Sequence, residues 1–406
     1  MIQITAGMTG AQFLAALNTI RREYNVMEYG AIPNSGVDET AHIQAAINAV
    51  WAAGGGVIYF PKGVYLISGA LQRNVDGGLD PKSQLYIPKP ATFDTRTSIT
   101  LRGEFVPHFT LAAGINVGIA KTPNIGTVLR STIENNVEDA FVIGSIGDTN
   151  LYGSFNYTQV VIEDLCIQTT VDASSQVTIG GIGMKHGGQN IMRRLTIGPY
   201  NIKGTDTALP INNCTGIALA GVFSEQLNTI SECIVSTFVN GYYLGDHASI
   251  DNSWAWVCLN AYVFGMNKLI ARGGKIEAQW CANIIVVIDD NASGDPRSLY
   301  VGCLNVENTA DGYWYDKVAH VVDAANLGRG EIHYDLNEDV RPGFVKVGGT
   351  GIMCSPIAVG KVTSGTDAGA TNFTITGARD ESEGALKNLI TKLCAKFGFV
   401  DGTTAS

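Results

Sequence analysis

The chain has 406 residues, of which 16% are charged and 48 are glycine, and its formal net charge is −10. This length allows a large buried core, and the low charge and abundant glycine favour short strands joined by tight turns. The acidic balance disfavours a broad surface for nucleic acid. No apolar run approaches membrane-spanning length, so we expect no membrane insertion.

The cysteines indicate where the protein folds. Eight cysteines occur singly, without a C-x-x-C pair or a Cys/His spacing typical of zinc. Buried free thiols are typical of a protein that folds in a reducing cytosol. The N-terminus shows no basic segment followed by an apolar one, as a secretory signal would. We therefore expect synthesis in a cytoplasm, and we expect no metal and no cofactor.

The first 23 residues predict a short helix. Thr9 to Gln12 fits a capping box, and the apolar residues that follow fall on one helical face. We interpret residues 1–23 as a neck or attachment helix, which either packs on the next helix or joins several chains.

Residues 24–68 predict a strand, a helix and two further strands. Asp38 is suited to cap the helix, because its carboxylate can accept from the free N–H groups of the first turn. Gly54–Gly56 ends the helix, and strands follow at 57–60 and 64–67. The apolar stripe of the helix consists of Ile43, Ala46, Ile47, Val50 and Trp51.

This segment resembles the N-terminal signature of the pectate-lyase-like right-handed parallel β-helix family. The matching positions are Tyr29-Gly30-Ala31, Asp38, Thr40, Ile43, Ala46-Ile47, Gly54 to Gly56, Phe60-Pro61, Gly63, Tyr65 and Ile67. The resemblance implies an all-β solenoid whose first coil is covered by the helix. The family includes polysaccharide lyases, glycoside hydrolases and bacteriophage tailspikes, and the signature itself contains no catalytic residue.

A weak apolar repeat supports stacked coils from about residue 160. It reads apolar-x-x-apolar-x-apolar, with the irregular spacing expected of coils that carry insertions. The copies are Ile162-Leu165-Ile167, Met192-Leu195-Ile197, Ile230-Cys233-Val235, Trp254-Trp256, Gly274-Ile276 and Val301-Leu304-Val306. We predict a β-helix with its cap over 24–310, a C-terminal β-rich segment over 311–380, and an amphipathic helix with a polar tail over 381–406.

Carboxylates in the later coils are the catalytic candidates. Glycan hydrolysis uses two carboxylates, and stacked like charges raise one pKa as a general acid requires. If Ile276 aligns with Val306, Glu277 and Glu307 stack on the outer surface. Glu232 and Asp251 form a second acidic group. The alternative for each is a solvated surface carboxylate.

Other family motifs are incomplete. Asp289-Asp290 resembles the double-Asp element of polygalacturonases, but the N-T-D and R-I-K elements of that family are missing. The calcium-binding Asp cluster of pectate lyases is not recognisable either. Neither of these mechanisms is supported by the sequence.

Aromatic residues concentrate in the same region, between 240 and 315, and predict a glycan groove. Exposed aromatic faces stack on sugar rings, whereas the alternative is burial in the core. The candidate binding residues are Trp254, Trp256, Trp280, Tyr243 and Arg272.

Three functions remain open on the sequence alone. We favour a homotrimeric bacteriophage tailspike, located in the virion and attached through a terminus to tail or adaptor proteins. It would bind and depolymerise a bacterial surface polysaccharide. A monomeric polysaccharide lyase or glycoside hydrolase is one alternative, and a non-catalytic virion adhesin or decoration protein is the other.

Overall fold

The computed structural model describes most of the region from residue 23 to residue 354. The described residues are 9, 23–72, 82–88, 97–105, 126–145, 158–172, 174, 176–184, 189–200, 214–219, 227–245, 247–265, 270–288, 297–307, 320–324, 330–336, 345–347 and 352–354. Apart from Thr9 and Glu23, the predicted terminal helices within 1–23 and 381–406 lie outside these ranges.

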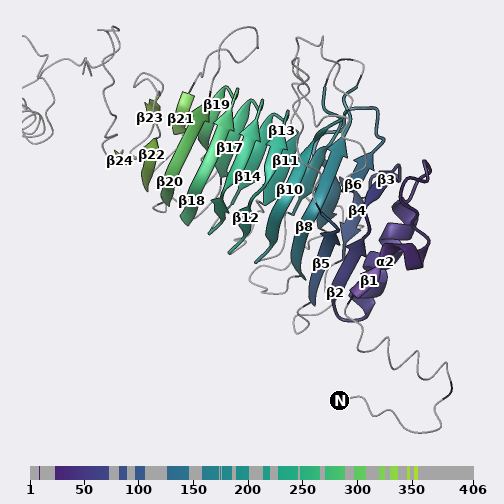
Figure 1. Ribbon diagram of the computed structural model, residues 1–406. Coiled ribbons are helices and arrows are strands. Elements are labelled where there is room, and N and C mark those ends of the chain that lie inside the picture. The colour runs from purple at the N-terminus through teal and green to yellow at the C-terminus, as the bar shows by residue number, and fades with distance from the viewer. Residues whose placement is uncertain are drawn as a thin grey trace, which may run out of the picture.

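The described strands form two parallel sheets that run side by side along the molecule (Figure 1). Sheet A has 15 strands: β1 (Glu23–Asn25), β2 (Gly56–Phe60), β3 (Gly63–Ile67), β5 (Thr97–Gly103), β6 (Thr127–Ser131), β8 (Thr158–Thr169), β10 (Ile191–Pro199), β12 (Thr229–Ser231), β13 (Ile234–Ser236), β15 (Ser249–Asp251), β16 (Ser253–Trp256), β18 (Ile270–Gln279), β20 (Arg297–Glu307), β22 (Gly330–Leu336) and β24 (Ile352–Cys354). Sheet B has 9 strands: β4 (Lys82–Ile87), β7 (Ala140–Ser145), β9 (Gly180–Gly183), β11 (Thr215–Leu219), β14 (Asn240–Leu244), β17 (Asn260–Gly265), β19 (Asn283–Ile288), β21 (His320–Ala324) and β23 (Val345–Val347).

The chain alternates between the two sheets and adds each new strand parallel to the previous one in that sheet. For example, β8 in sheet A leads to β9 in sheet B, and β10 then pairs with β8 in parallel. Each coil therefore contributes one layer to a solenoid, with layers about 4.8 Å apart. This topology confirms the predicted right-handed parallel β-helix.

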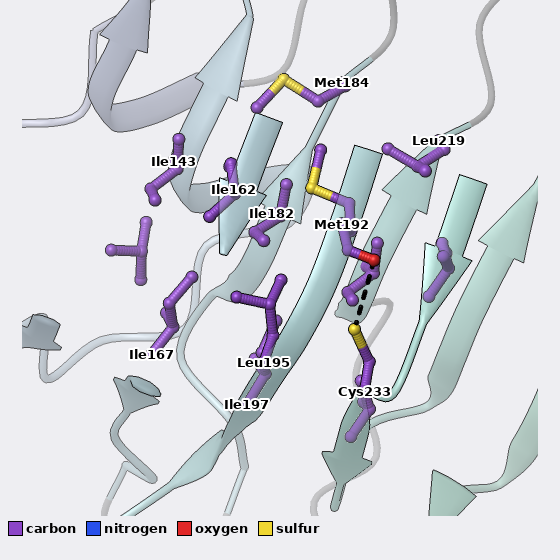
Figure 2. Packing of buried hydrophobic residues seen from close by; sticks show 14 of the residues in the cluster. Ile143, Ile162, Ile167, Ile182, Met184, Met192, Leu195, Ile197, Leu219 and Cys233 are labelled. Carbon is purple, nitrogen blue, oxygen red and sulfur yellow. Dashed lines mark hydrogen bonds between the residues drawn. The ribbon is translucent and has the colours of Figure 1, made fainter. Parts of the chain in front are cut away.

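The first copies of the apolar repeat stack as predicted. Met192 is in register with Ile162 on one side and with Ile230 on the other. Ile197 is in register with Ile167 and with Val235 in the same way. These side chains point inward and are fully buried together with the inward residues of sheet B, as Figure 2 shows for Ile143, Ile182 and Leu219.

Sheet A changes direction at a bend that recurs from coil to coil. The bend residues are Asp164, Arg194, Glu232 and Asn252, whose φ angles are 58°, 50°, 55° and 44°. Non-glycine residues seldom adopt this left-handed conformation, and its repetition in adjacent coils shows that stacking imposes it. The bend separates a first half of sheet A, such as β12 and β15, from a second half, such as β13 and β16.

Parallel pairing continues beyond the predicted boundary at residue 310. β21 pairs with β19 in sheet B, and β22 pairs with β20 in sheet A. β23 and β24 then add one more layer to each sheet. The solenoid therefore extends at least to Cys354, beyond the end at residue 310 that the sequence pattern predicted.

Helix α2 (Thr40–Ala52) covers the first coil at the N-terminal end of the solenoid (Figure 1). The predicted stripe of Ile43, Ala46, Ile47 and Val50 is fully buried, and Trp51 is partly buried against the core. The helix begins one residue later than a cap at Asp38 would require, since Glu39 occupies the cap position. Asp38 nevertheless accepts a hydrogen bond from the Thr40 amide at 3.0 Å and one from the Ser68 amide at 2.8 Å.

Gln44 on α2 forms hydrogen bonds with backbone groups at the free edge of sheet B. Its amide nitrogen donates to the Tyr86 carbonyl, and its amide oxygen accepts from the Tyr86 N–H, both at 3.0 Å. Tyr86 lies in β4, which is the terminal strand of sheet B. Together with the backbone of Gln72, which bridges Ser83 of the same strand, this side chain takes the place of the missing next strand, which an exposed edge would otherwise offer to another chain.

We predict that Gln44→Leu destabilises the protein by about 1–3 kcal/mol, because it leaves a backbone donor and acceptor of β4 unsatisfied under the helix. Chemical denaturation followed by circular dichroism measures this change. Asn48→Ala is the matched control, since it removes only the intrahelical bond in which Asn48 accepts from Gln44 at 3.0 Å. Equal effects of the two variants would show that Gln44 does not act on the sheet edge.

Candidate functional site

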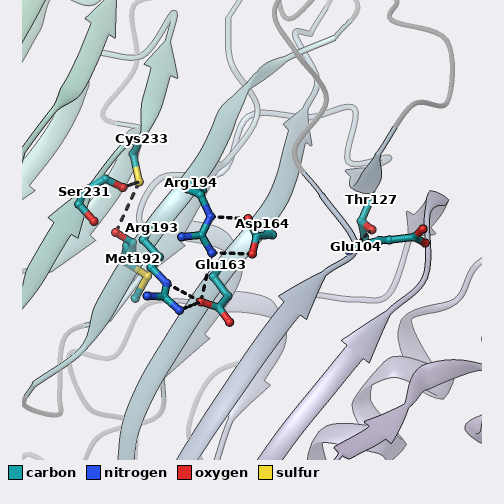
Figure 3. A network of polar contacts seen from close by, with 9 residues as sticks. All are labelled: Glu104, Thr127, Glu163, Asp164, Met192, Arg193, Arg194, Ser231 and Cys233. Atoms are coloured by element: carbon teal, nitrogen blue, oxygen red, sulfur yellow. Dashed lines mark hydrogen bonds and ion pairs between the residues drawn. The ribbon is translucent and has the colours of Figure 1, made fainter.

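Charged residues line the bend of sheet A in successive coils (Figure 3). Arg194 donates to both carboxylate oxygens of Asp164, with N–O distances of 2.6 and 2.7 Å. Its neighbour Arg193 donates from Nε to Glu163 at 2.5 Å. The hydrogen bond from Arg194 to Asp164 is the main reason why the pKa of Arg194 is raised above its ordinary value. These pairs join adjacent coils on the outer surface.

The second predicted acidic group, Glu232 and Asp251, lies at the same bend. Glu232 and Asp251 lie in adjacent coils, and both are exposed. The Asp251 carboxylate accepts from the Lys275 amide of the next coil at 2.8 Å, and the Glu232 amide donates to the Asp251 carbonyl at 3.2 Å. Asp251 therefore has a structural role in stacking, and a catalytic role for either residue stays a prediction.

Glu277 and Glu307 do not stack, although the predicted alignment of the repeat copies placed one directly above the other. Glu277 is in register with Asn305, and Glu307 is in register with Gln279. The alignment was two residues out because Val306 lies opposite Ala278 and not opposite Ile276. On ideal strand spacing and rise, the Cα atoms of the two glutamates are diagonal neighbours about 8 Å apart.

Two rows of register positions run along the second half of sheet A, on the face away from the solenoid core. We call them the Glu277 row and the Trp256 row. The Glu277 row contains Cys166, Thr196, Ile234, Trp254, Glu277 and Asn305. The Trp256 row contains Arg130, Gln168, Gly198, Ser236, Trp256, Gln279 and Glu307. Because parallel strands stack in register, each row is a straight line along the solenoid axis.

Three tryptophans cluster where these rows cross the later coils. The rings of Trp254 and Trp256 are stacked with centroids 5.7 Å apart, and Trp280 lies 5.6 Å from Trp256 at a tilt of 36°. Trp256 is buried, whereas Trp254 and Trp280 are partly exposed. The structure thus brings all three predicted binding tryptophans together, with Glu277 adjacent to Trp254 in its row.

Interior tyrosines hold the backbone beneath this cluster. Tyr242 and Tyr262 of sheet B stack with centroids 5.2 Å apart and an interplanar angle of 6°. The Tyr262 hydroxyl lies 2.8 Å from the Ser253 carbonyl and 2.6 Å from the Glu277 carbonyl and shares its single proton between them. The Tyr242 hydroxyl reaches the Trp254 carbonyl at 3.0 Å. The backbone carbonyls of Trp254 and Glu277 are therefore each held by a tyrosine hydroxyl from inside the solenoid.

Two predicted binding residues lie elsewhere. Tyr243 is in β14 of sheet B, and because Tyr242 points inward, Tyr243 points out from a different face of the solenoid. The backbone of Arg272 is in register with Ser249 and Tyr300, on the other side of the bend from Glu277. The side chains of Arg272 and Glu307 lie outside the described part of the structure.

The sequence reading missed two groups of residues. One is the set of charged pairs at the bend, although the repeat contained their signal: Glu163-Asp164 and Arg193-Arg194 fill the same two positions in consecutive copies. The other is Arg130 with Gln168 and Tyr200. Arg130 lies in a region where no repeat was recognised, so no sequence signal placed it in a row with later coils.

Some classes of site are not found among the described residues. Within them, no group of three or more His, Cys, Asp or Glu side chains is arranged to hold a metal ion. No helix of the described part is both long and apolar enough to cross a bilayer.

The N-terminal segment matches a known family model. Residues 24–99 match the model described as "Rhamnogalacturonase A/epimerase, pectate lyase-like". Over 65 residues the chain is 49% identical to mannuronan C5-epimerase AlgE5 and 48% identical to alginate lyase 7, both from Azotobacter vinelandii. This match covers 16% of the chain but only 6% and 8% of those relatives.

Solved structures resemble a larger part of the chain at low sequence identity. The A-module of Azotobacter vinelandii mannuronan C-5 epimerase AlgE4 aligns with 82% of this chain and 97% of its own, at 14% identity and a TM-score of 0.39. The tailspike protein of Escherichia coli bacteriophage HK620, solved with a pentasaccharide, aligns with 85% of this chain and 61% of its own. Its identity is 10% and its TM-score is 0.43.

We predict that Tyr262→Phe lowers the free energy of unfolding by about 1–3 kcal/mol, since it removes the buried hydroxyl whose proton two carbonyls share. Burial raises the pKa of Tyr262 well above its ordinary value of 10.0. Its stabilisation is therefore complete below pH 10 and decreases at higher pH, as the tyrosine of the unfolded chain ionises. Denaturation curves between pH 7 and pH 11 measure both effects.

Tyr243→Phe is the matched control, because Tyr243 is half-buried on the outer side of the neighbouring strand. We expect it to change stability by less than about 0.5 kcal/mol. If Tyr262→Phe were equally mild and left the alkaline profile unchanged, its hydroxyl would not anchor the site.

Proposed function

We propose that the protein is a tailspike-like, polysaccharide-binding β-helix protein that binds and cleaves a bacterial surface polysaccharide. The observation that carries this proposal is the cluster of Trp254, Trp256 and Trp280 beside Glu277 on one outward face. Tryptophan offers the flat apolar surface on which sugar rings stack, and a carboxylate beside it offers the group that glycoside cleavage needs.

The shape of the surface favours a chain-like ligand. The partly exposed residues of the Glu277 row lie in line along the solenoid axis in four consecutive coils: Ile234, Trp254, Glu277 and Asn305. A linear glycan that lies along this row would contact the tryptophans through the faces of its rings and polar residues through its edges. A small, single-sugar ligand would not use a surface of this length.

Sequence similarity gives limited support for a glycan as ligand. The relatives that match over 65 residues are named for reactions on mannuronan and alginate. The family-model match covers residues 24–99, which form the cap and first coils and contain none of the proposed site residues. The support for this ligand class therefore comes chiefly from the outer face of sheet A.

For cleavage we propose Glu277 as one carboxylate and Glu307 as the other. Diagonal neighbours whose Cα atoms are about 8 Å apart can bring their carboxyl groups to the 6.5–9.5 Å separation of inverting glycoside hydrolases. In this arrangement one carboxyl group protonates the glycosidic oxygen, and the other activates a water molecule on the opposite side of the sugar. Glu232 and Asp251 are the second candidate pair, and they lie within one coil of each other at the bend.

We predict that Glu277→Gln lowers the rate of polysaccharide cleavage at least 100-fold, because it removes a general acid or base while keeping the shape of the side chain. The affinity of this variant for the polysaccharide should change little. Trp254→Ala should instead weaken binding about tenfold or more, since it removes a stacking surface. Capsular and lipopolysaccharide panels, with calorimetry for affinity and reducing-end release for cleavage, measure both quantities.

The controls separate the two carboxylate pairs. Glu307→Gln should behave as Glu277→Gln does, whereas Glu232→Gln and Asp251→Asn should leave cleavage intact. Loss of cleavage only in the latter two variants would move the active site to the bend. Binding without cleavage by the unmodified protein would indicate the adhesin alternative.

We also predict a homotrimer in solution, as the tailspike proposal requires. Light scattering should give a mass of about three times 43.1 kDa. A mass of 43.1 kDa would favour the free-standing polysaccharide enzyme and would contradict assembly into a spike.

A further inference from the structure

Two cysteines of adjacent coils lie together inside the solenoid. Cys258 and Cys281 each stand two residues before an asparagine, and these asparagines, Asn260 and Asn283, are in register. The Ala282 amide donates to the Cys258 carbonyl at 3.3 Å, which is the bond expected when Cys258 lies directly over Cys281. Both side chains are fully buried and belong to the main core.

The two residues contact each other through sulfur. The Cys258 amide donates to the Cys281 sulfur at 3.4 Å. The Cys281 thiol also faces the carbonyls of Ala255 at 3.6 Å and Gln279 at 3.4 Å. The Cys258 thiol faces the Trp256 carbonyl at 3.5 Å. Thiols are weak donors, so these contacts do not fix either sulfur strongly in place.

The separation of the pair suits a disulfide. Positions in register on parallel strands are about 4.8 Å apart, and the Cα atoms that a disulfide joins are roughly 4.4–6.8 Å apart. The backbones of the two coils are therefore already at a distance that the bond spans. Cys166, by comparison, is in register with Val128 and Thr196, neither of which can form this bond.

We propose that Cys258 and Cys281 are an oxidation site, at which a disulfide forms between two coils when the protein meets a peroxide outside a reducing compartment. One thiolate attacks hydrogen peroxide, which breaks the O–O bond and gives a sulfenic acid and hydroxide. The other thiolate then attacks the sulfenic sulfur, which forms the S–S bond and releases a second hydroxide. The two thiol protons convert the hydroxides to water, so two thiols are oxidised and one peroxide is reduced to two water molecules.

The surroundings of the pair determine when it reacts. Burial raises the pKa of Cys281 well above its ordinary value of 9.0, and its hydrogen bond with Cys258 adds to this effect. The pair therefore persists as thiols at neutral pH and reacts slowly. Because both side chains are fully buried, a peroxide of nearly the size of water reaches them more readily than a bulky disulfide such as oxidised glutathione.

The disulfide would join the two coils that carry the tryptophan cluster. Cys258 follows Trp256 by two residues, and Cys281 follows Trp280 directly. Each coil of a solenoid contacts only its neighbours, so coils can separate one at a time. A covalent bond between adjacent coils prevents this separation, and the closed loop 258–281 also restricts the unfolded chain. This role does not depend on a ligand.

The test treats the folded full chain with hydrogen peroxide, blocks the remaining thiols, and maps disulfides by mass spectrometry after digestion without reductant. We expect a linked pair of peptides that contains Cys258 and Cys281. We expect the oxidised protein to melt at a temperature roughly 4 °C higher than the reduced protein. Dithiothreitol, which leaves oxidised methionines unchanged, should separate the peptides and remove the rise.

Variants and alternative outcomes decide the assignment. Cys258→Ala and Cys281→Ala should each abolish the linked pair and the rise. Cys233→Ala should keep both, since the Cys233 sulfur contacts the backbone carbonyls of Met192 and Ser231. The mapping of the unmodified protein needs no variant to fold: free thiols at both positions, a sulfinic acid at either, or a disulfide to another cysteine would overturn the proposal. A linked pair without a higher melting temperature would overturn the stabilising role. None of these results depends on whether a glycan binds.

Discussion

The strict register of parallel strands is the constraint on which the rest of this structure depends. Each backbone hydrogen bond between coils fixes which residue lies above which, so an outward side chain meets the same neighbours for as long as the pairing continues. The bend shows the strength of this constraint. Arg194 and Glu232 adopt left-handed backbone conformations that their side chains do not favour, because the coils on either side bend at the same place. The same register lines up the Trp256 row and the charged pairs at the bend.

Volume inside the solenoid explains why the tryptophans face outward. Tyr242 and Tyr262 of sheet B are large, inward and fully buried. The inward residues of sheet A near them are small, Ser253 and Ala255, which leaves room in the interior for the two tyrosine rings. Trp254 and Trp256 alternate with these small residues and therefore point out. The interior tyrosines thus determine the surface on which a glycan would stack, and their hydroxyl groups fix its backbone.

The same reasoning shows how much of the structure could be predicted from the sequence. The cap, the solenoid and the first stacked copies follow from local patterns, because Ile162, Met192 and Ile230 are large apolar residues at equivalent positions. The later register could not be predicted in this way. There some inward residues are small, such as Ala278, so the apolar pattern is weak. For this reason Glu277 was aligned with Glu307 of β20, whereas it is in register with Asn305. The tryptophan cluster was predicted because its members are close in sequence. Arg130 was not, since its row joins residues from coils that share no recognisable repeat.

The physical role of the cap also explains why the family-model match lies at the N-terminal end of the solenoid. Any parallel β-helix has to cover its first coil, and here α2 does so with a buried apolar stripe and with Gln44, which satisfies the last strand of sheet B. These requirements come from the ends of the sheets and do not depend on the ligand. The outward rows of sheet A face different requirements, because their side chains lie outside the core of the solenoid and the register does not fix which residues occupy them. A match over residues 24–99 therefore identifies how the solenoid begins. Under the proposed function, ligand specificity would instead reside in later coils, where Trp254 and Glu277 are partly exposed neighbours in register.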